Sequence, residues 1–289
     1  MELLNFLRYF VTITAIYGIF ALSLNFQYGH AGLVNFGQVF FFCIGGYTMA
    51  IAISAGLHFF PSLFLALAVC GFVGFLISYT ARNMGGTYWG IVTLAVGEIV
   101  RLVFLNENWL AGGANGISLK VAIPYFEVLI LIFTALAFLL TRTIMESPFG
   151  RVLKTIREGD DLALSLGKDV FSFKKKAMTV GGILGGLAGA LFAAQKKFIN
   201  PEDFFPIETF IVWAMVVVGG KGNDRGTLWG AIIIQVFYVG TRFAKDYLPI
   251  SGNRLAALRM VFIGLLIMLT MMYRSKGLVP EKRKVYKVE

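Results

Sequence analysis

Residues 177–194 are AMTVGGILGGLAGALFAA, an apolar run without a charged residue in which glycine recurs at every fourth position. A bilayer core about 30 Å thick needs about 20 apolar residues for one helical crossing. Gly181, Gly185 and Gly189 fall on one face of such a helix, where small residues let a neighbouring helix approach closely. The run therefore predicts a membrane-spanning helix inside a tightly packed bundle.

Similar apolar runs extend from this segment to both ends of the chain. Hydrophobic residues make up 57% and charged residues 15% of the 289 residues, against about 45–50% and about 25% in soluble domains. We predict an all-α integral membrane bundle, a single domain over residues 1–289 with eight to ten transmembrane helices. The nine candidate segments are residues 6–26, 39–57, 59–80, 88–105, 125–144, 177–194, 207–219, 227–240 and 255–273.

Two glycine-rich polar pieces, residues 27–38 and 219–226, interrupt the apolar pattern. Irregular backbone at membrane depth is stable only where it is buried in protein or lines a cavity. These pieces predict short or broken helices.

A weak internal repeat links two parts of the chain. Residues 86–90 (GTYWG) resemble residues 226–230 (GTLWG), and the same offset brings Gly45 and Gly46 onto Gly185 and Gly186. Two repeated halves are typical of transporters, in parallel or inverted arrangement. Coincidence is the competing interpretation, because glycine pairs are common in membrane helices.

The net charge of +10 comes from basic residues in loops between the apolar runs, with no aromatic-interleaved basic face of the kind that binds nucleic acid. Lysine and arginine concentrate in the loop of residues 146–176 and in the tail of residues 274–289. Positive loops stay on the cytoplasmic side, and four apolar segments, an even number, separate the two. We therefore expect the chain to lie in the plasma membrane, with both the loop and the C-terminal tail on the cytoplasmic side.

The loop begins with a predicted short amphipathic helix. Ser147 precedes Pro148 as an N-cap, and the apolar spacing ends near Gly159. Asp160 or Asp161 can cap a second helix over residues 162–166.

Gly167 is expected to close that second helix in the left-handed conformation, and Ser172 to cap the helix that returns to the membrane. A two-turn helix that exposes leucines and Ala163 is too short to be stable alone. It needs a partner, either the lipid interface or the groove of a cytoplasmic protein.

Several stretches together resemble the branched-chain amino acid permease family of ATP-binding cassette (ABC) transporters. They are FGQVFFFCIGGYTMA (36–50), GTYWGIVTLAVGEIVRLVF (86–104), LAGGANGIS (110–118), SPFGRVLKTIREGDDLALSLG (147–167), GGILGGLAGALFA (181–193) and VVVGGKGNDRGTLWGA (216–231).

The resemblance implies that the loop helix docks into an ATPase, with Gly167 at the family's glycine position. The expected coupling residues are Arg151, Arg157, Asp160, Asp161, Ala163, Leu166 and Gly167. The resemblance also implies three kinds of partner. They are two cytoplasmic ATPase subunits that bind the ATP, a second permease that is related or identical to this chain, and an extracytoplasmic solute-binding protein. The chain itself would need no cofactor, and a bacterial or archaeal membrane would hold it. The implied solute is a branched-chain amino acid, and urea and short amides are the next candidates.

Polar side chains inside or beside the apolar segments are candidates for the solute path: Tyr47, Thr48, Thr93, Glu98 and Asn115. Most buried hydroxyls bond their own helix instead. Glu98 can pair with Arg101 three residues on, and Asn115 can belong to an ordinary turn. The glycines expected to pack helices are Gly45, Gly46, Gly181, Gly185 and Gly189.

We predict no catalytic or metal site. The two histidines, His30 and His58, have no acidic or cysteine neighbours in sequence, and residues 219–222 do not fit a phosphate-binding loop. The competing function is an ion- or proton-coupled secondary transporter, for which Glu98 is the one plausible intramembrane acid.

Overall fold

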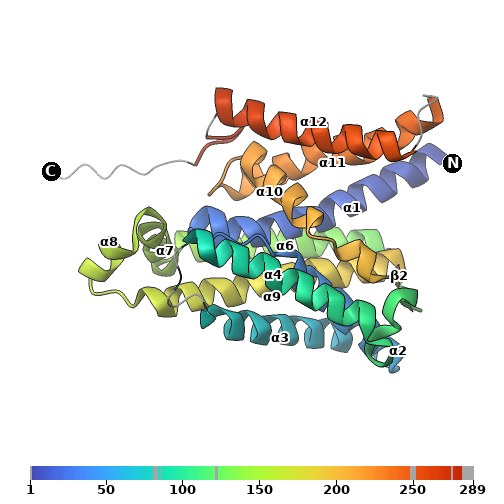
Figure 1. The fold of residues 1–289 in the computed structure, drawn as a ribbon, viewed down its shortest axis with the longest axis horizontal. Helices are drawn as coiled ribbons and strands as arrows, with labels where there is room; N and C mark the ends of the chain where they lie inside the picture. The colour runs from blue at the N-terminus through green and yellow to red at the C-terminus, as the bar shows by residue number, and fades with distance from the viewer. Residues whose placement is uncertain are drawn as a thin grey trace.

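A computed structural model of the chain describes residues 2–80, 84, 86–120, 123–247, 252–274 and 276–281. Almost every element is helical (Figure 1). The α-helices are α1 (Glu2–Leu24), α2 (Val39–Ser54), α3 (Phe59–Ser78), α4 (Gly86–Asn106), α5 (Asn108–Ala111), α6 (Phe126–Glu146), α7 (Pro148–Glu158), α8 (Asp160–Ser165), α9 (Val170–Lys196), α10 (Ile207–Gly219), α11 (Asp224–Tyr247) and α12 (Gly252–Tyr273). The short elements are the π-helix η1 (Asn25–His30), the 3-10 helices η3 (Gly113–Asn115) and η4 (Pro201–Phe204), and strands β1 (Ile117–Ser118) and β2 (Phe198–Ile199).

Each of the nine predicted apolar segments coincides with one helix, namely α1, α2, α3, α4, α6, α9, α10, α11 and α12. Among the described residues, five helical stretches are long and apolar enough to cross a membrane: Asn5–His30, Phe59–Ser78, Tyr88–Asn106, Phe126–Glu146 and Val170–Lys196. Shorter apolar helices accompany them at Val39–Ser54, Ile207–Gly219 and Met260–Tyr273. The predicted all-α polytopic class, with some short helices, is confirmed.

Helix α9 lies in the middle of the bundle and packs against α1, α2 and α3 (Figure 1). Its glycines allow this closeness. A Cβ atom on Gly189 would lie 1.9 Å from the carbonyl oxygen of Phe42 in α2, and one on Gly45 would lie 2.2 Å from the carbonyl oxygen of Gly186. The backbones of α2 and α9 therefore touch, as the small-residue spacing predicts.

The predicted break at residues 27–38 is present and begins slightly earlier. The last turn of α1 widens into η1, and irregular chain follows to the start of α2. The polar side chains of this segment are buried and hydrogen-bond to one another. Asn35 Nδ2 donates to Gln27 Oε1 (2.8 Å) and to Gln38 Oε1 (2.6 Å). Irregular backbone at this depth is thus shielded by protein. The second predicted break is the short turn between α10 and α11.

The two ends of the bundle differ. At one end β1 pairs antiparallel with β2, with Ile117 opposite Ile199, and ties the loop after α4 to the end of α9. At the other end α7 and α8 project beyond the remaining helices (Figure 1). The described part of the C-terminal tail lies at this second end, because Glu281 contacts Lys154 of α7. Loop and tail therefore share one end of the bundle; residues 282–289 of the tail lie outside the described residues.

The sequence repeat stays a prediction, although its members occupy comparable places. Residues 86–90 open α4, and residues 226–230 lie in the first turns of α11. The two glycine pairs belong to α2 and α9, the helices whose backbones touch.

Candidate functional site

Helix α7 has an apolar face that anchors it to the bundle end. Leu153 is fully buried in a cluster with Phe26 and Met145, and Ile156 is buried beside Val170 of α9. The helix begins after Ser147 with Pro148 in its first turn and ends before Gly159, as predicted. The hydroxyl of Ser147 does not cap it, however, because it donates to the carbonyl oxygen of Ile144 (2.6 Å).

Two further capping predictions are wrong. Helix α8 begins at Asp160, so Asp160 and Asp161 occupy its first turn and Gly159 holds the N-cap position. Their negative charges still suit the positive end of the helix dipole. The returning helix α9 is capped by Asp169, whose Oδ1 accepts from the backbone N–H of Ser172 (3.2 Å), and not by the Ser172 side chain.

Ala163 lies on the inner face of α8, which corrects the expectation that it is exposed. It has no accessible surface and packs with Ile156 and Val170. A methyl group is small enough to let the backbone of α8 rest on α7 and α9. The leucines face outward instead: Leu162, Leu164 and Leu166 are each more than half exposed.

The end of α8 has the expected geometry. Gly167 has φ +68°, the N–H of Lys168 donates to the carbonyl oxygen of Ala163 (3.0 Å), and the N–H of Gly167 donates to that of Leu164 (2.9 Å). These two bonds define a Schellman motif, which favours glycine at the left-handed position. A Cβ atom on Gly167 would meet nothing within 4 Å, so only the backbone conformation restricts this position within the chain.

The seven predicted coupling residues divide into an exposed group of five and an inward-facing pair, Arg157 and the buried Ala163. Arg151, Asp160, Asp161, Leu166 and Gly167 are exposed around α7 and α8, and Asp160 pairs with Lys174 (2.5 Å).

Arg157 faces the protein instead. Its Nη2 atom lies 2.8 Å from Glu281 Oε2, and its Nη1 atom donates to the carbonyl oxygen of Gly29 (2.5 Å). Glu281 also pairs with Lys154 (2.8 Å). Burial raises the pKa of the Glu281 carboxyl, but hydrogen bonds from Lys154 and Arg157 outweigh burial and hold this pKa below its ordinary value. The carboxylate therefore stays ionised at neutral pH.

The five candidate path residues lie on three elements, α2, α4 and η3, and make separate contacts. Tyr47 of α2 is buried with its ring stacked on Phe104 (centroids 4.0 Å apart), and its hydroxyl has no hydrogen-bond partner among the described residues. Thr48 is half-buried on the same helix. Thr93 of α4 donates to Gly90 of its own helix (2.7 Å).

The remaining two path candidates also have local explanations. Glu98 accepts from the Arg101 Nε atom (3.0 Å), and the buried Arg101 lies over the ring of Phe205 (4.5 Å). Asn115 is exposed in η3, at the end opposite α8. The packing glycines Gly46, Gly181 and Gly185 face Phe204, Gln27 and Phe41, respectively.

Sequence reasoning missed a buried polar cluster at the break. His30 Nε2 lies 2.8 Å from Asp224 Oδ1, and Asn25 Nδ2 donates to the same oxygen (2.9 Å). Asp224 appears in the stretch VVVGGKGNDRGTLWGA, but nothing in its spacing points to His30. Among the described residues no three histidine, cysteine, aspartate or glutamate side chains gather as metal ligands would.

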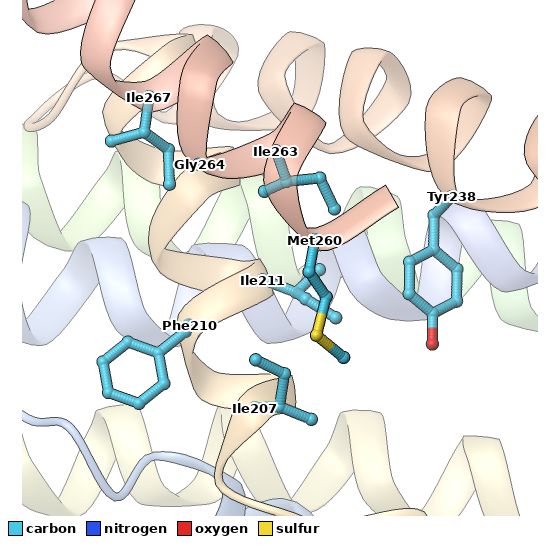
Figure 2. Close-up of a pocket in the computed structure, with 8 residues that line it drawn as sticks. All are labelled: Ile207, Phe210, Ile211, Tyr238, Met260, Ile263, Gly264 and Ile267. Carbon is cyan, nitrogen blue, oxygen red and sulfur yellow. The ribbon is translucent and has the colours of Figure 1, made fainter. Parts of the chain in front are cut away.

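A cavity of about 160 Å³ lies between α10, α11 and α12 (Figure 2). Its lining is Ile207, Phe210, Ile211, Tyr238, Met260, Ile263, Gly264 and Ile267. None of these side chains is charged, so the cavity does not suit the ammonium and carboxylate groups of an amino acid. None of the predicted path residues lines it.

Comparison with known proteins agrees with this architecture. The profile of the family described as "Branched-chain amino acid transport system / permease component" matches residues 6–271. The high-affinity branched-chain amino acid transport system permease protein LivM of Salmonella typhimurium is 32% identical over 96% of this chain and 71% of its own length. A probable branched-chain amino acid transport permease protein LivM of Methanocaldococcus jannaschii is 27% identical over 92% and 91%.

Relatives of a second kind also match. The permease protein LivH of Salmonella typhimurium is 24% identical over 90% of this chain and 92% of its own length. No solved structure matches. Since the profile and the relatives cover nearly all of its helices, the chain is a multi-pass membrane protein that belongs to the family of branched-chain amino acid transport system permease components.

Proposed function

We propose that this chain is the membrane-spanning subunit of an ABC importer for branched-chain amino acids and that separate ATPase subunits drive it through α8. The observation that carries the proposal is the shape of α8. A six-residue helix is held on the bundle by the buried Ala163, ends in a Schellman motif at Gly167, and turns three leucines away from the protein.

An ATPase groove would complete this helix. A helix this short is unstable alone, and its outward leucines gain up to about 1.5–3 kcal/mol each if a partner buries them. The acidic first turn orients the helix, and exposed bases such as Arg151 and Lys168 surround it and steer the encounter. Docking alone does not move solute, because a partner that binds both conformations equally shifts neither. ATP-bound and ATP-free ATPases must therefore hold α8 in different positions.

The remaining subunits follow from the same proposal. Two permeases are needed to surround a path, so we expect this chain to pair with a related permease or a second copy. Relatives of both kinds, LivM and LivH, occur in Salmonella typhimurium. The end that carries β1, β2 and η3 would then face outward and receive a solute-binding protein, while α8 and the described part of the tail would face the cytoplasm (Figure 1).

The proposed solute is the one for which the relatives are named, with urea and short amides as alternatives. Tyr47, Thr48, Thr93, Glu98 and Asn115 stay candidates for its path. Tyr47 is the most suitable of the described five, because its buried hydroxyl has no hydrogen-bond partner in the described part of the chain.

The decisive experiment is uptake by the reconstituted complex. Proteoliposomes that contain this chain, its partner permease and two ATPases should accumulate radiolabelled leucine only with ATP inside and binding protein outside. Ionophores that collapse ion gradients should leave the rate unchanged. Uptake that survives without ATP but stops with the ionophore would instead assign the chain to the secondary transporters.

A further inference from the structure

The chain after α12 folds back onto the bundle and reaches α7. We call residues 276–281 the C-terminal strap. The backbone N–H groups of Leu278 and Val279 donate to the carbonyl oxygens of Val218 (2.9 Å) and Gly219 (3.0 Å) at the end of α10. The Asn223 side chain donates to the carbonyl oxygens of Val279 (3.2 Å) and Pro280 (3.1 Å). The strap is therefore attached to the α10–α11 turn independently of its charges.

Glu281 connects this strap to α7 through both carboxylate oxygens. Oε1 lies 2.8 Å from the ammonium of Lys154, and Oε2 lies 2.8 Å from Nη2 of Arg157. The side chains of Glu281 and Arg157 are only 19% and 21% exposed, whereas those of the Arg142–Glu146 pair are 47% and 66% exposed. A charge-assisted pair that water reaches poorly is stronger than an exposed one.

The same guanidinium reaches the break in the first helix. Nη1 of Arg157 donates to the carbonyl oxygen of Gly29 in η1. The backbones are also close, because a Cβ atom on Gly32 would lie 3.0 Å from the Cα atom of Arg157. Arg157 thus joins three parts of the protein: the strap, α7 and the break.

The break end of this connection is itself firmly held. Asn25 Oδ1 accepts from the N–H of Gly222 (2.9 Å), and Asn25 Nδ2 donates to Asp224. The segment that contains Gly29 is therefore bonded to the start of α11 and leads directly into α2. Such chains of packed and hydrogen-bonded groups can carry a movement between distant elements.

We infer that Glu281 is a positioning residue, which holds the Arg157 guanidinium on the carbonyl oxygen of Gly29 so that a displacement of α7 and α8 is passed to the break in the first helix. The inference deepens the proposed function, on which it rests for the source of that displacement. Without Glu281, the positive charges of Lys154 and Arg157 have no carboxylate between them and repel each other. Arg157 is then free to turn away from Gly29.

Amide hydrogen exchange of the full-length permease, without ATPases, tests the contact itself. Glu281→Gln should speed exchange in residues 148–167 and in residues 25–32 by roughly tenfold, the scale of a lost charge-assisted hydrogen bond. Lys154→Met removes one ion pair but leaves Arg157 held, so only residues 148–167 should change. Glu281→Asp should restore part of the protection in both segments. Glu146→Gln, which breaks an exposed pair, is the matched control and should change neither segment.

The complete complex tests the consequence. Glu281→Gln should raise the ATP hydrolysed per leucine transported several-fold while ATPase binding stays normal, and Glu281→Asp should lower that ratio again. Unchanged exchange in residues 25–32 of Glu281→Gln would overturn the inference, and so would faster exchange with a wild-type coupling ratio. If the wild-type chain binds no ATPase, the proposed function fails, whereas the exchange result still decides whether Glu281 holds α7 against the break.

Discussion

His30 Nε2 lies 2.8 Å from Asp224 Oδ1, although 194 positions separate the two residues in the chain. An ionised carboxylate only accepts hydrogen bonds, so His30 Nε2 is the donor in this contact. The two residues join the end of η1 to the first turn of α11, both of them buried. A buried polar contact between distant segments stabilises one arrangement of the bundle, because breaking it leaves several groups unsatisfied.

Replacement of Asp224 by Ala should therefore destabilise the protein. It removes the acceptor of the His30 and Asn25 donors, and an unsatisfied buried donor costs about 1–3 kcal/mol. We expect a lower thermal unfolding temperature in detergent and a lower yield of folded protein. His30→Ala should act in the same direction, whereas His58→Ala, at an exposed position, should not. Wild-type stability of Asp224→Ala would contradict this view of the cluster.

Gly167→Val should uncouple ATP hydrolysis from uptake. Valine at φ +68° costs roughly 1–2 kcal/mol, but a Cβ atom at this position meets nothing within 4 Å, so the bundle should still insert and fold. The end of α8 should shift and change the surface offered to the ATPase. The control is Gly56→Val, which imposes a similar strain at φ +90° in open space after α2. Normal uptake by Gly167→Val in proteoliposomes would count against the proposed role of α8.

Leu166→Asp and Ala163→Leu should separate docking from folding. The exposed Leu166 can be replaced without disturbing the bundle, so unfolding should be unchanged while the Kd for the ATPase rises by tenfold or more. Leu57→Asp, at an exposed leucine outside the loop, should alter neither property. Ala163→Leu overfills a packed site and should cost about 1–3 kcal/mol of stability. Equal effects of the two α8 variants on unfolding would refute this division.

How far the sequence predicts this molecule depends on the range of the interactions involved. The nine apolar segments follow from composition, and the left-handed Gly167 follows from local spacing. The inward position of Ala163 does not, because the burial of a two-turn helix depends on which neighbours cover it. The cap at Asp169 was missed because Asp169 and Ser172 both favour N-cap positions and only the backbone path selects between them. His30–Asp224 and Glu281–Arg157 pair residues far apart in the chain, and one sequence carries no signal for such pairs.

Acidification should release α7 from the C-terminal strap only well below neutral pH. The pKa of folded Glu281 lies below its ordinary value of 4.5, so its ion pairs stabilise the protein fully above that value and are lost as the pH falls through the folded pKa. A spin label on Arg151→Cys should therefore keep its electron paramagnetic resonance (EPR) mobility from pH 8 to pH 5.5, then become more mobile at lower pH. The same label in Glu281→Gln should be mobile throughout. Release of the wild-type label between pH 7 and pH 6 would contradict the direction of the shift.

Glu98→Gln should damage folding or assembly more than solute preference. The buried Arg101 has Glu98 as its ion-pair partner and otherwise lies on the Phe205 ring, so an amide at position 98 leaves a guanidinium with uncompensated charge. The cost, about 1–3 kcal/mol, is reduced to the extent that the partly exposed Glu98 is solvated. Yield after detergent extraction and pairing with the second permease should both fall.

The double variant Glu98→Gln with Arg101→Gln should fold better than Glu98→Gln alone, because removing both charges leaves none buried without a partner. Competition between leucine, isoleucine, urea and short amides for uptake should rank the solutes alike in wild type and in every variant that assembles. A changed ranking in a well-assembled Glu98→Gln complex would place this carboxylate on the solute path. Its pairing with Arg101 would then be part of recognition, and the solute's ammonium group would be the natural ligand for the carboxylate.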